Sequence, residues 1–382
     1  MKAPVQSDRG LRRSPVPSGR PRVVSGPGWL RLRLRLRLWL SLWFGLRFGF
    51  GLGLRFGFGF GLRLRLRLRL GFGIGGGRYA RRMATLTIAA AQFAPVDDPA
   101  VNLATVRTAA EDAAARGADL LVTPEYTSYF TAEIDDRFAA SAEPLDGPFV
   151  SGLREIARTT GIALVVGVAE AVGSADDPIR VGGTEADADT DATGLADVNG
   201  LAVARRFRNT LVAVLPDGSV AAVYRKVHLY DAFGSRESDR IEAGDTDQLP
   251  VFTIAGVRVG LETCYDLRFP EVTRRLAAEE SGAADVVLVP AEWVRGPGKE
   301  HHWRTLLTAR AVENTVWVVG VGQTPPVGIG GSVVLDPSGV AVAAAGAVPG
   351  VLVATVDTAT TASVRAVNPS LGLRRYDVVP RG

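Results

Sequence analysis

The chain of 382 residues contains one cysteine, Cys264, and only three histidines. A single cysteine excludes an intramolecular disulfide and a zinc site built from several cysteines. The histidines, His228, His301 and His302, lack the spacing of a metal motif such as HExxH, so we expect no metal site. A lone cysteine is usually a small buried apolar residue, and its neighbours must decide whether it is reactive.

Acidic residues are almost absent from the first 82 positions. Residues 1–82 contain 19 Lys and Arg and one acid, Asp8, whereas residues 83–382 contain 25 basic and 39 acidic residues, a formal charge of −14. The sequence pI of about 9.4 therefore reflects the N-terminal segment. It does not indicate a nucleic-acid-binding domain, and we expect no nucleic-acid partner.

Long apolar runs are also missing from this segment. Residues 29–72 are low-complexity sequence that alternates Arg with Leu and Phe with Gly. The longest uncharged stretch there, residues 38–46, has nine residues, whereas a membrane-spanning helix needs roughly 18–20. Arg residues also interrupt the apolar region that a secretory signal peptide would need. We expect no membrane partner and interpret residues 1–82 as an upstream extension, with the working protein beginning at Met83. A membrane-surface or nucleic-acid-binding arm is the alternative.

Strand-like and helix-like stretches alternate after Met83. We expect strands at residues 85–92, 119–123, 162–170, 286–290, 316–321 and 351–357, and helices at 97–116, 148–161, after Pro270 and at 302–314. Hairpins are expected at 211–215 with 220–227 and at 251–254 with 257–261. Residues 172–199 have little that could form a core and are interpreted as a surface insertion. The pattern predicts one α/β domain over residues 83–382, a mixed sheet with helices outside.

Three expected strand ends carry residues suited to covalent amide hydrolysis. Glu125 follows the strand at 119–123, Lys226 ends the first hairpin, and Cys264 follows the second hairpin. A thiolate can attack an amide carbonyl if a base takes its proton, and a carboxylate among apolar residues has the raised pKa such a base needs. A fixed ammonium and a backbone N–H after Cys264 would stabilise the oxyanion.

Each of these residues also has a structural interpretation. Glu125 alone would be a solvated acid and Lys226 a surface lysine. However, only three of the 44 cationic residues are lysines, namely Lys2, Lys226 and Lys299, and the others are arginines. A lysine in a chain that otherwise uses arginine favours a specific role for Lys226. Cys264 is close to polar Thr263 and Asp266, which is unlike the apolar surroundings of a cysteine that only packs in a core.

Other residues near these positions have two interpretations as well. His228 is a rival partner for Cys264, although a structural hydrogen bond fits it better. Trp293 follows a strand and would either line a substrate site or pack. His301 and His302 open a helix, which indicates surface or pocket rim.

At this point the segments resemble the Glu-Lys-Cys motifs of the nitrilase (carbon–nitrogen hydrolase) superfamily, in the same chain order. The three main segments are PE at 124–125, YRKVHL at 224–229 and CYDLRFPE at 264–271. The similarity extends to AAQ at 90–92, ES at 237–238 and ARAVEN at 309–314. Together they run from about residue 85 to residue 357, nearly all of the chain after Met83. The extension and the 172–199 stretch depart from the family pattern.

The resemblance implies an α-β-β-α sandwich, no metal or organic cofactor, and a homodimer or higher homo-oligomer. It implies that Glu125 is the base, Lys226 the oxyanion partner and Cys264 the nucleophile. Glu237 resembles the second glutamate that positions substrate or Lys226, and Tyr265 and Trp293 are expected to support substrate binding.

We therefore expect an amidase that releases ammonia or a small amine from a small linear amide through a cysteine thioester. The CYDLRFP context is more similar to the ω-amidase or deaminated-glutathione amidase branch than to true nitrilases. An N-carbamoyl-amide hydrolase or a nitrilase would use the same triad. A non-catalytic binding protein on the same scaffold is the alternative of another class. We expect a cytoplasmic location.

Overall fold

Two mixed six-stranded sheets form the centre of the computed structural model, which describes residues 83–172, 206–278 and 283–381. The predicted N-terminal extension and nearly all of the predicted 172–199 insertion lie outside these ranges. The first sheet has the order β12-β1-β2-β3-β4-β5, with β1 (Thr85–Gln92), β2 (Leu120–Val122), β3 (Ala163–Ala171), β4 (Phe207–Val214), β5 (Val220–Arg225) and β12 (Gly350–Asp357). The second has the order β11-β10-β9-β8-β7-β6, with β6 (Val251–Ile254), β7 (Val257–Leu261), β8 (Val286–Ala291), β9 (Trp317–Gly322), β10 (Val333–Leu335) and β11 (Ala341–Ala344).

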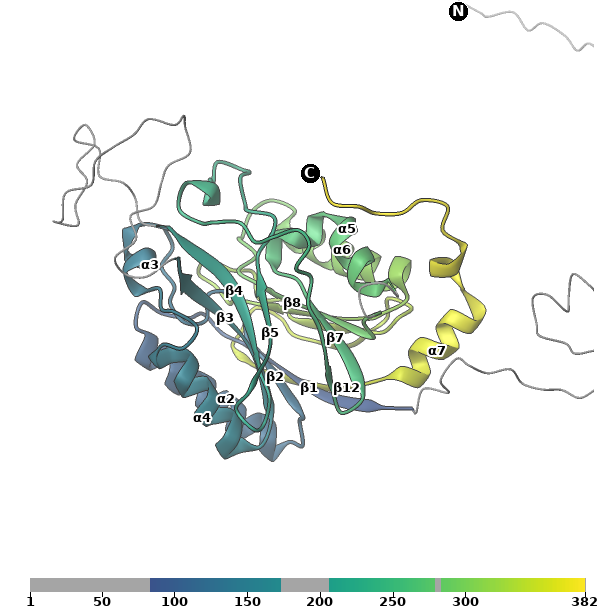
Figure 1. Cartoon of the computed structure of the whole chain (residues 1–382), viewed down its shortest axis with the longest axis horizontal. Coiled ribbons are helices and arrows are strands. Elements are labelled where there is room, and N and C mark those ends of the chain that lie inside the picture. The colour runs from purple at the N-terminus through teal and green to yellow at the C-terminus, as the bar shows by residue number, and fades with distance from the viewer. Residues whose placement is uncertain (1–82, 173–205, 279–282, 382) are drawn as a thin grey trace, which may run out of the picture. The chain divides into compact units, whose positions relative to one another are not determined.

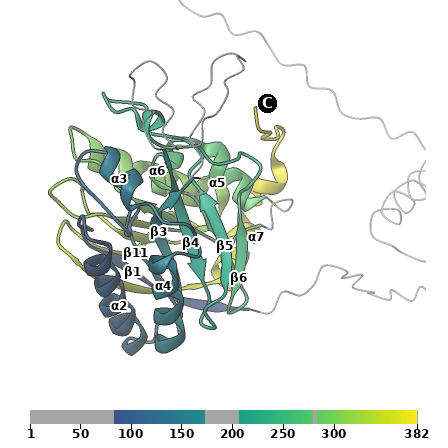
Figure 2. The same ribbon diagram turned by 60° about the vertical axis from the view of Figure 1, so that its left-hand side comes forward.

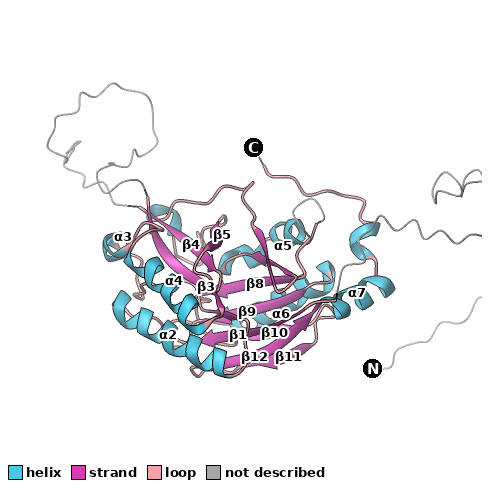
Figure 3. Ribbon diagram, turned by 60° about the horizontal axis from the view of Figure 1, so that its bottom comes forward, coloured by secondary structure: helices cyan, strands magenta, loops and turns pink. Residues whose placement is uncertain are grey.

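Helices cover the outer face of each sheet. The helices of the described residues are α2 (Pro99–Ala115), α3 (Asp136–Ser141), α4 (Pro148–Thr160), α5 (Pro270–Ala277), α6 (Lys299–Asn314) and α7 (Thr358–Val367), and α2, α4, α5 and α6 pack on the sheets. Helices α2 and α4 run side by side on one side of the strands, and α5 and α6 lie on the other (Figures 1 and 3). The Asp98 side chain accepts from the first N–H groups of α2, and α4 ends at Gly161, whose φ of 72° suits a glycine.

Alternation along each strand builds three apolar layers. In β1, Leu86, Ile88 and Ala90 belong to the core between the two sheets, whereas Ala89 and Ala91 belong to the core under α2 and α4. A third core joins the second sheet to α5 and α6. Figure 2 shows the first sheet behind α2 and α4. These layers confirm the predicted α-β-β-α sandwich.

All strands that were placed from the sequence are present, with any differences at their ends, whereas the short strands β10 and β11 were not placed. Strand β5 ends at Arg225, so Lys226, which was expected within the hairpin strand at 220–227, lies just beyond it. Helix α6 begins at Lys299 and not at residue 302, so His301 and His302 lie within its first turn. Helix α3 was not predicted because six residues are too few to show a helical period. No helix of the described residues is long and apolar enough to cross a bilayer.

Strand direction brings the candidate residues together. Strand β5 runs parallel to β2, because β3 is parallel to β2 and the pairings β3–β4 and β4–β5 are both antiparallel. In the second sheet β7, β8 and β9 are parallel. Glu125 follows β2, Lys226 follows β5 and Cys264 lies just after β7, so all three lie beyond carboxyl ends of strands. Polar side chains at such ends commonly form binding sites.

Candidate active site

Glu125 is held in a narrow space at the end of β2. Its side chain is 1% exposed, and the adjacent β3 residue is Gly167, where an added Cβ would lie 2.9 Å from the Glu125 Cα. The Oε1 atom accepts from Asn209 Nδ2 at 2.6 Å, and Oε2 accepts from the Glu292 backbone N–H at 2.7 Å. Gln323 Nε2 also donates to the Glu125 carbonyl at 2.8 Å. Groups from both sheets therefore fix this carboxylate.

Lys226 lies between two carboxylates. Its ammonium donates to Glu125 Oε1 at 3.0 Å and to both oxygens of Glu237, at 2.9 and 2.8 Å. Glu237 is held in turn by the Tyr126 hydroxyl at 2.8 Å and the Tyr230 backbone N–H at 2.6 Å. The Lys226 side chain is 1% exposed. A buried ammonium needs such partners, because leaving it unpaired would cost several kcal/mol.

Cys264 opens the short 3-10 helix η2 (Cys264–Arg268) with a φ of 46°, a conformation that is uncommon for a residue other than glycine. The turn is fixed by Asp266, a fully buried carboxylate that accepts from the Thr263 N–H at 3.1 Å and the Tyr224 hydroxyl at 2.6 Å. Asp266 Oδ1 also contacts the His228 N–H and Nδ1. One carboxylate thus joins the Cys264 turn to the segment that follows β5.

The charges around Cys264 keep its thiol protonated in the resting protein. Burial raises the pKa of Cys264 most, and Glu125 raises it further, while Lys226 opposes them. For Lys226 itself burial disfavours the charged form, but Glu125 and Glu237 outweigh burial and raise the pKa of the ammonium. The site therefore contains a neutral thiol, a cation and carboxylates beside it. Such a thiol becomes nucleophilic only when a base removes its proton.

A pocket lies beside these residues. Its lining contains the predicted residues Glu237, Cys264, Tyr265 and Trp293, together with Tyr230, Arg268, Glu292, Val294 and Lys299. The predicted Tyr265 and Trp293 thus line the same pocket as Cys264. The lining suits a small polar molecule with some apolar contact.

Two cations and several aromatic rings line or adjoin this pocket. Arg268 lies over Trp293, 4.9 Å from the ring centroid, and Lys299 lies 4.0 Å from that of Phe233. Lys299 also donates to the Tyr230 hydroxyl at 2.8 Å. Burial and the nearby Arg268 lower the pKa of Lys299. Two cations in one lining make the pocket suitable for an anion.

His228 makes the structural contacts that its sequence context favoured. Its ring stacks on Phe269 with centroids 3.7 Å apart, and Nδ1 lies 2.8 Å from Asp266. It is not among the residues that line the pocket. His301 and His302 lie on α6 and do not line it either. No group of three or more His, Cys, Asp or Glu in the described ranges is arranged to hold a metal ion.

Sequence reasoning did not identify several residues of this site. Asn209, near the start of β4, donates a hydrogen bond to Glu125. In the sequence only its polar side chain near the start of an apolar strand could have indicated this role. Tyr126 directly follows the predicted PE motif, and Arg268 lies within the predicted CYDLRFPE motif. Glu292 follows β8, so the strand-end argument used for Glu125 would have found it.

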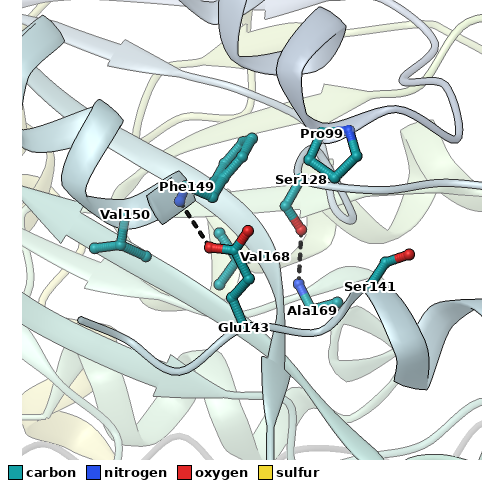
Figure 4. A pocket seen from close by; sticks show the side chains of 8 residues that line it. All are labelled: Pro99, Ser128, Ser141, Glu143, Phe149, Val150, Val168 and Ala169. Carbon is teal, nitrogen blue, oxygen red and sulfur yellow. Dashed lines mark hydrogen bonds between the residues drawn. The ribbon is translucent and has the colours of Figure 1, made fainter. Parts of the chain in front are cut away.

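A second cavity, of about 250 Å³, lies near the start of α4 (Figure 4). Glu143 accepts from the Phe149 N–H at 2.7 Å, and Ser128 accepts from the Ala169 N–H at 2.9 Å. Both polar side chains thus satisfy backbone donors. This cavity has no nucleophile with a neighbouring base and is a packing feature.

Comparison with known proteins identifies the family. Residues 87–366 match the carbon–nitrogen hydrolase family. The chain belongs to this family. It is 46% identical over 171 residues to "Deaminated glutathione amidase" of Escherichia coli O157:H7, a match that covers 45% of this chain and 63% of that protein. It is 34% identical over 296 residues to "Hydrolase Rv0480c" of Mycobacterium tuberculosis, covering 73% of this chain and 92% of that one.

A solved amidase structure is similar throughout the described fold. It is a mutant of the amidase from Nesterenkonia sp. AN1 with the acetamide moiety of fluoroacetamide added covalently at the active site cysteine. The TM-score is 0.57 at 28% identity, and the match covers 76% of this chain and 94% of that chain. These matches confirm the predicted family and its amidase branch. This carbon–nitrogen hydrolase is an enzyme of the amidase type.

Proposed function

We propose that this carbon–nitrogen hydrolase cleaves a small linear amide through a thioester on Cys264, with Glu125 as the base and Lys226 as the oxyanion partner. The observation that carries the proposal is the shared ammonium. Lys226 donates to Glu125 at 3.0 Å and to Glu237 at 2.8 Å, beside a pocket that contains Cys264. If this buried base, cation and nucleophile served only the fold, apolar residues in their place would stabilise it better.

The reaction begins with a proton transfer. Glu125 takes the thiol proton of Cys264 as sulfur attacks the amide carbon, and the carbonyl oxygen becomes an oxyanion. Lys226 and a backbone N–H after Cys264 stabilise that oxyanion. The intermediate collapses when Glu125 returns the proton to the leaving nitrogen, so that the C–N bond breaks and ammonia or an amine departs. A thioester remains on Cys264.

Hydrolysis of the thioester repeats the same steps. Glu125 takes a proton from water while the water oxygen attacks the thioester carbon, and the sulfur departs with a proton when the carboxylic acid forms. Glu237 supports both halves, because its contacts with Lys226, Tyr126 and the Tyr230 N–H fix the ammonium in place. Glu237 is a positioning residue in this account.

We further propose that the substrate carries a carboxylate. Arg268 and Lys299 both line the pocket that contains Cys264, so they can bind an anionic group of the substrate. Relatives named deaminated glutathione amidase, such as the mouse protein at 30% identity over 303 residues, support this class. The predicted cytoplasmic location and homo-oligomer remain predictions.

Ammonia release by the full chain tests the proposal. The panel contains deaminated glutathione, carboxylate-bearing ω-amides, N-carbamoyl compounds and nitriles, each with Cys264→Ala and with Ser338→Ala, an exposed turn residue, as the control variant. We expect turnover of the carboxylate-bearing amides that Cys264→Ala abolishes and Ser338→Ala retains. Turnover that survives in Cys264→Ala would refute the thioester route, and turnover confined to nitriles or carbamoyl compounds would refute the substrate class.

A further inference from the structure

The segment ARAVEN at 309–314, which the proposed mechanism does not use, places a buried arginine on α6. Arg310 lies on the buried face of this helix, next to Leu307 and Ala311 of the core that joins α6 to the second sheet. Arginine is rarely buried, because its charge must leave water and find partners. Packing alone therefore does not account for an arginine at this position.

The partners of the guanidinium show why it is buried. Nη1 donates to Glu313 Oε1 at 3.0 Å, and the Glu313 side chain is 36% exposed. Exposed ion pairs contribute little to stability, so this acid gives no reason to bury Arg310. Nη2 donates instead to a buried acceptor, the Leu267 carbonyl, at 2.5 Å. The contact with Leu267 therefore accounts for the inward position of the guanidinium.

The Leu267 carbonyl belongs to η2, the short helix that Cys264 opens. In a 3-10 helix a carbonyl accepts from the N–H three residues further along the chain. For Leu267 that residue is Pro270, the first residue of α5, which has no N–H. A buried carbonyl near the end of a helix needs a donor from elsewhere, and Arg310 supplies one from α6.

The Cys264 turn is thus held from two layers of the fold. Asp266 ties η2 to the Tyr224 hydroxyl of β5 in the first sheet, and Arg310 ties the later part of η2 to α6. Cys264 itself has a φ of 46°, which its surroundings must maintain because a residue other than glycine seldom adopts it. The position of the Cys264 side chain therefore depends on both contacts.

We propose that Arg310 is a positioning residue for Cys264, whose contact with the Leu267 carbonyl keeps the thiol oriented so that Glu125 can take its proton. The inference rests on the proposed function, because it concerns the attack of Cys264 on the amide carbon. Arg310 is not among the residues that line the pocket. Its loss should therefore slow the chemical step and leave substrate binding nearly unchanged.

Steady-state kinetics of the full chain on deaminated glutathione test the proposal with Arg310→Met, which fills similar space without a donor. We expect kcat to fall by about 10²-fold, as a displacement of about 1 Å at a reacting group can cause, and KM to stay nearly the same. Arg310→Lys keeps a charge and N–H donors and should recover part of kcat. The matched control is Arg304→Gln, at an exposed position of the same helix, which should behave as the native protein.

Alkylation by iodoacetamide is a second measurement that needs no substrate. Cys264 is the only cysteine of the chain, so the reaction reports on its thiol alone. The rate at neutral pH should fall in Arg310→Met and recover in part in Arg310→Lys, because Glu125 assists removal of the thiol proton here as well. Arg304→Gln should again match the native rate.

Urea unfolding followed by tryptophan fluorescence gives the folded fraction of each variant under assay conditions. If Arg310→Met does not fold, Arg310→Gln replaces it, since glutamine is shorter than arginine and ends before the Leu267 carbonyl. Native kcat and a native alkylation rate per folded chain in the variant without the contact would overturn the inference, as would an effect confined to KM. Turnover that persists in Cys264→Ala would instead refute the proposed function.

Discussion

Glu262 makes the stability of this protein depend on pH. It lies two residues before Cys264, is fully buried, and accepts from the Thr273 hydroxyl at 2.7 Å. Burial raises the pKa of Glu262 to about 8, which the Thr273 hydrogen bond only partly offsets. In the unfolded chain a glutamate has a pKa of about 4.3. The folded protein therefore keeps a proton that the unfolded chain releases.

The sign and size of the effect follow from this difference. Between about pH 4.5 and 8 the unfolded chain binds fewer protons than the folded one at this site, so the free energy of unfolding falls as pH rises. A difference of about 3.7 pKa units corresponds to on the order of 5 kcal/mol, fully lost once the pH exceeds the folded pKa. Below about pH 4.5 Glu262 is protonated in both the folded and the unfolded state, so it no longer makes the free energy of unfolding depend on pH.

Glu262→Gln removes this titration and retains an acceptor for Thr273. The free energy of unfolding, measured in urea from pH 5 to 9, should be similar for the variant and the native protein at pH 5. At pH 9 the variant should be more stable by several kcal/mol. Glu300→Gln, at an exposed position, is the control and should not alter the pH dependence. A constant difference between Glu262→Gln and the native protein across this range would refute the argument.

Three further substitutions test the centre of the site. Lys226→Met leaves the buried Glu125 and Glu237 carboxylates without a cation and should lower kcat/KM in steady-state assays by at least about 10²–10³-fold. Lys226→Arg should not restore kcat/KM. Tyr126→Phe removes one hydrogen bond to Glu237 and should lower kcat by about 5–10-fold with little change in KM, and a change confined to KM would argue against positioning. Asp266→Asn replaces a carboxylate oxygen, which accepts hydrogen bonds, by an amide N–H₂ that cannot accept them. We expect the free energy of unfolding to fall by about 2–4 kcal/mol in urea titrations. Unchanged stability would contradict the role of Asp266 at the Cys264 turn.

Much of the fold could be predicted because its strands are short apolar runs bounded by turn residues. Strand β1 and the hairpin β6–β7 have the predicted limits, since Gly and Pro interrupt the pattern there. The division into two facing sheets required the family resemblance. Periodicity shows which residues are apolar, but not which sheet a strand joins. That choice depends on contacts between strands far apart in sequence, such as β1 with β12.

The site could be predicted where chemistry and strand ends coincide. Glu125, Lys226 and Cys264 combine a reactive residue type with a position just beyond a strand, and the structure brings them together. The partners of these residues could not be found in the same way. Asn209 reaches Glu125 across 84 positions of sequence, and local pattern carries no information on such a contact. The roles of Arg268 and Lys299 depend on a pocket that only the folded chain forms.

The most direct test of the account is the intact mass of the full chain during turnover. Mixing the native chain with a carboxylate-bearing amide and quenching in acid at a series of early times should trap an acyl group on the protein before water hydrolyses the thioester. The account predicts one acyl group per chain, located on the peptide that contains Cys264, released by hydroxylamine and absent in Cys264→Ala. Ammonia release by the native protein, with no acyl group on Cys264 at any time of quenching, would contradict it.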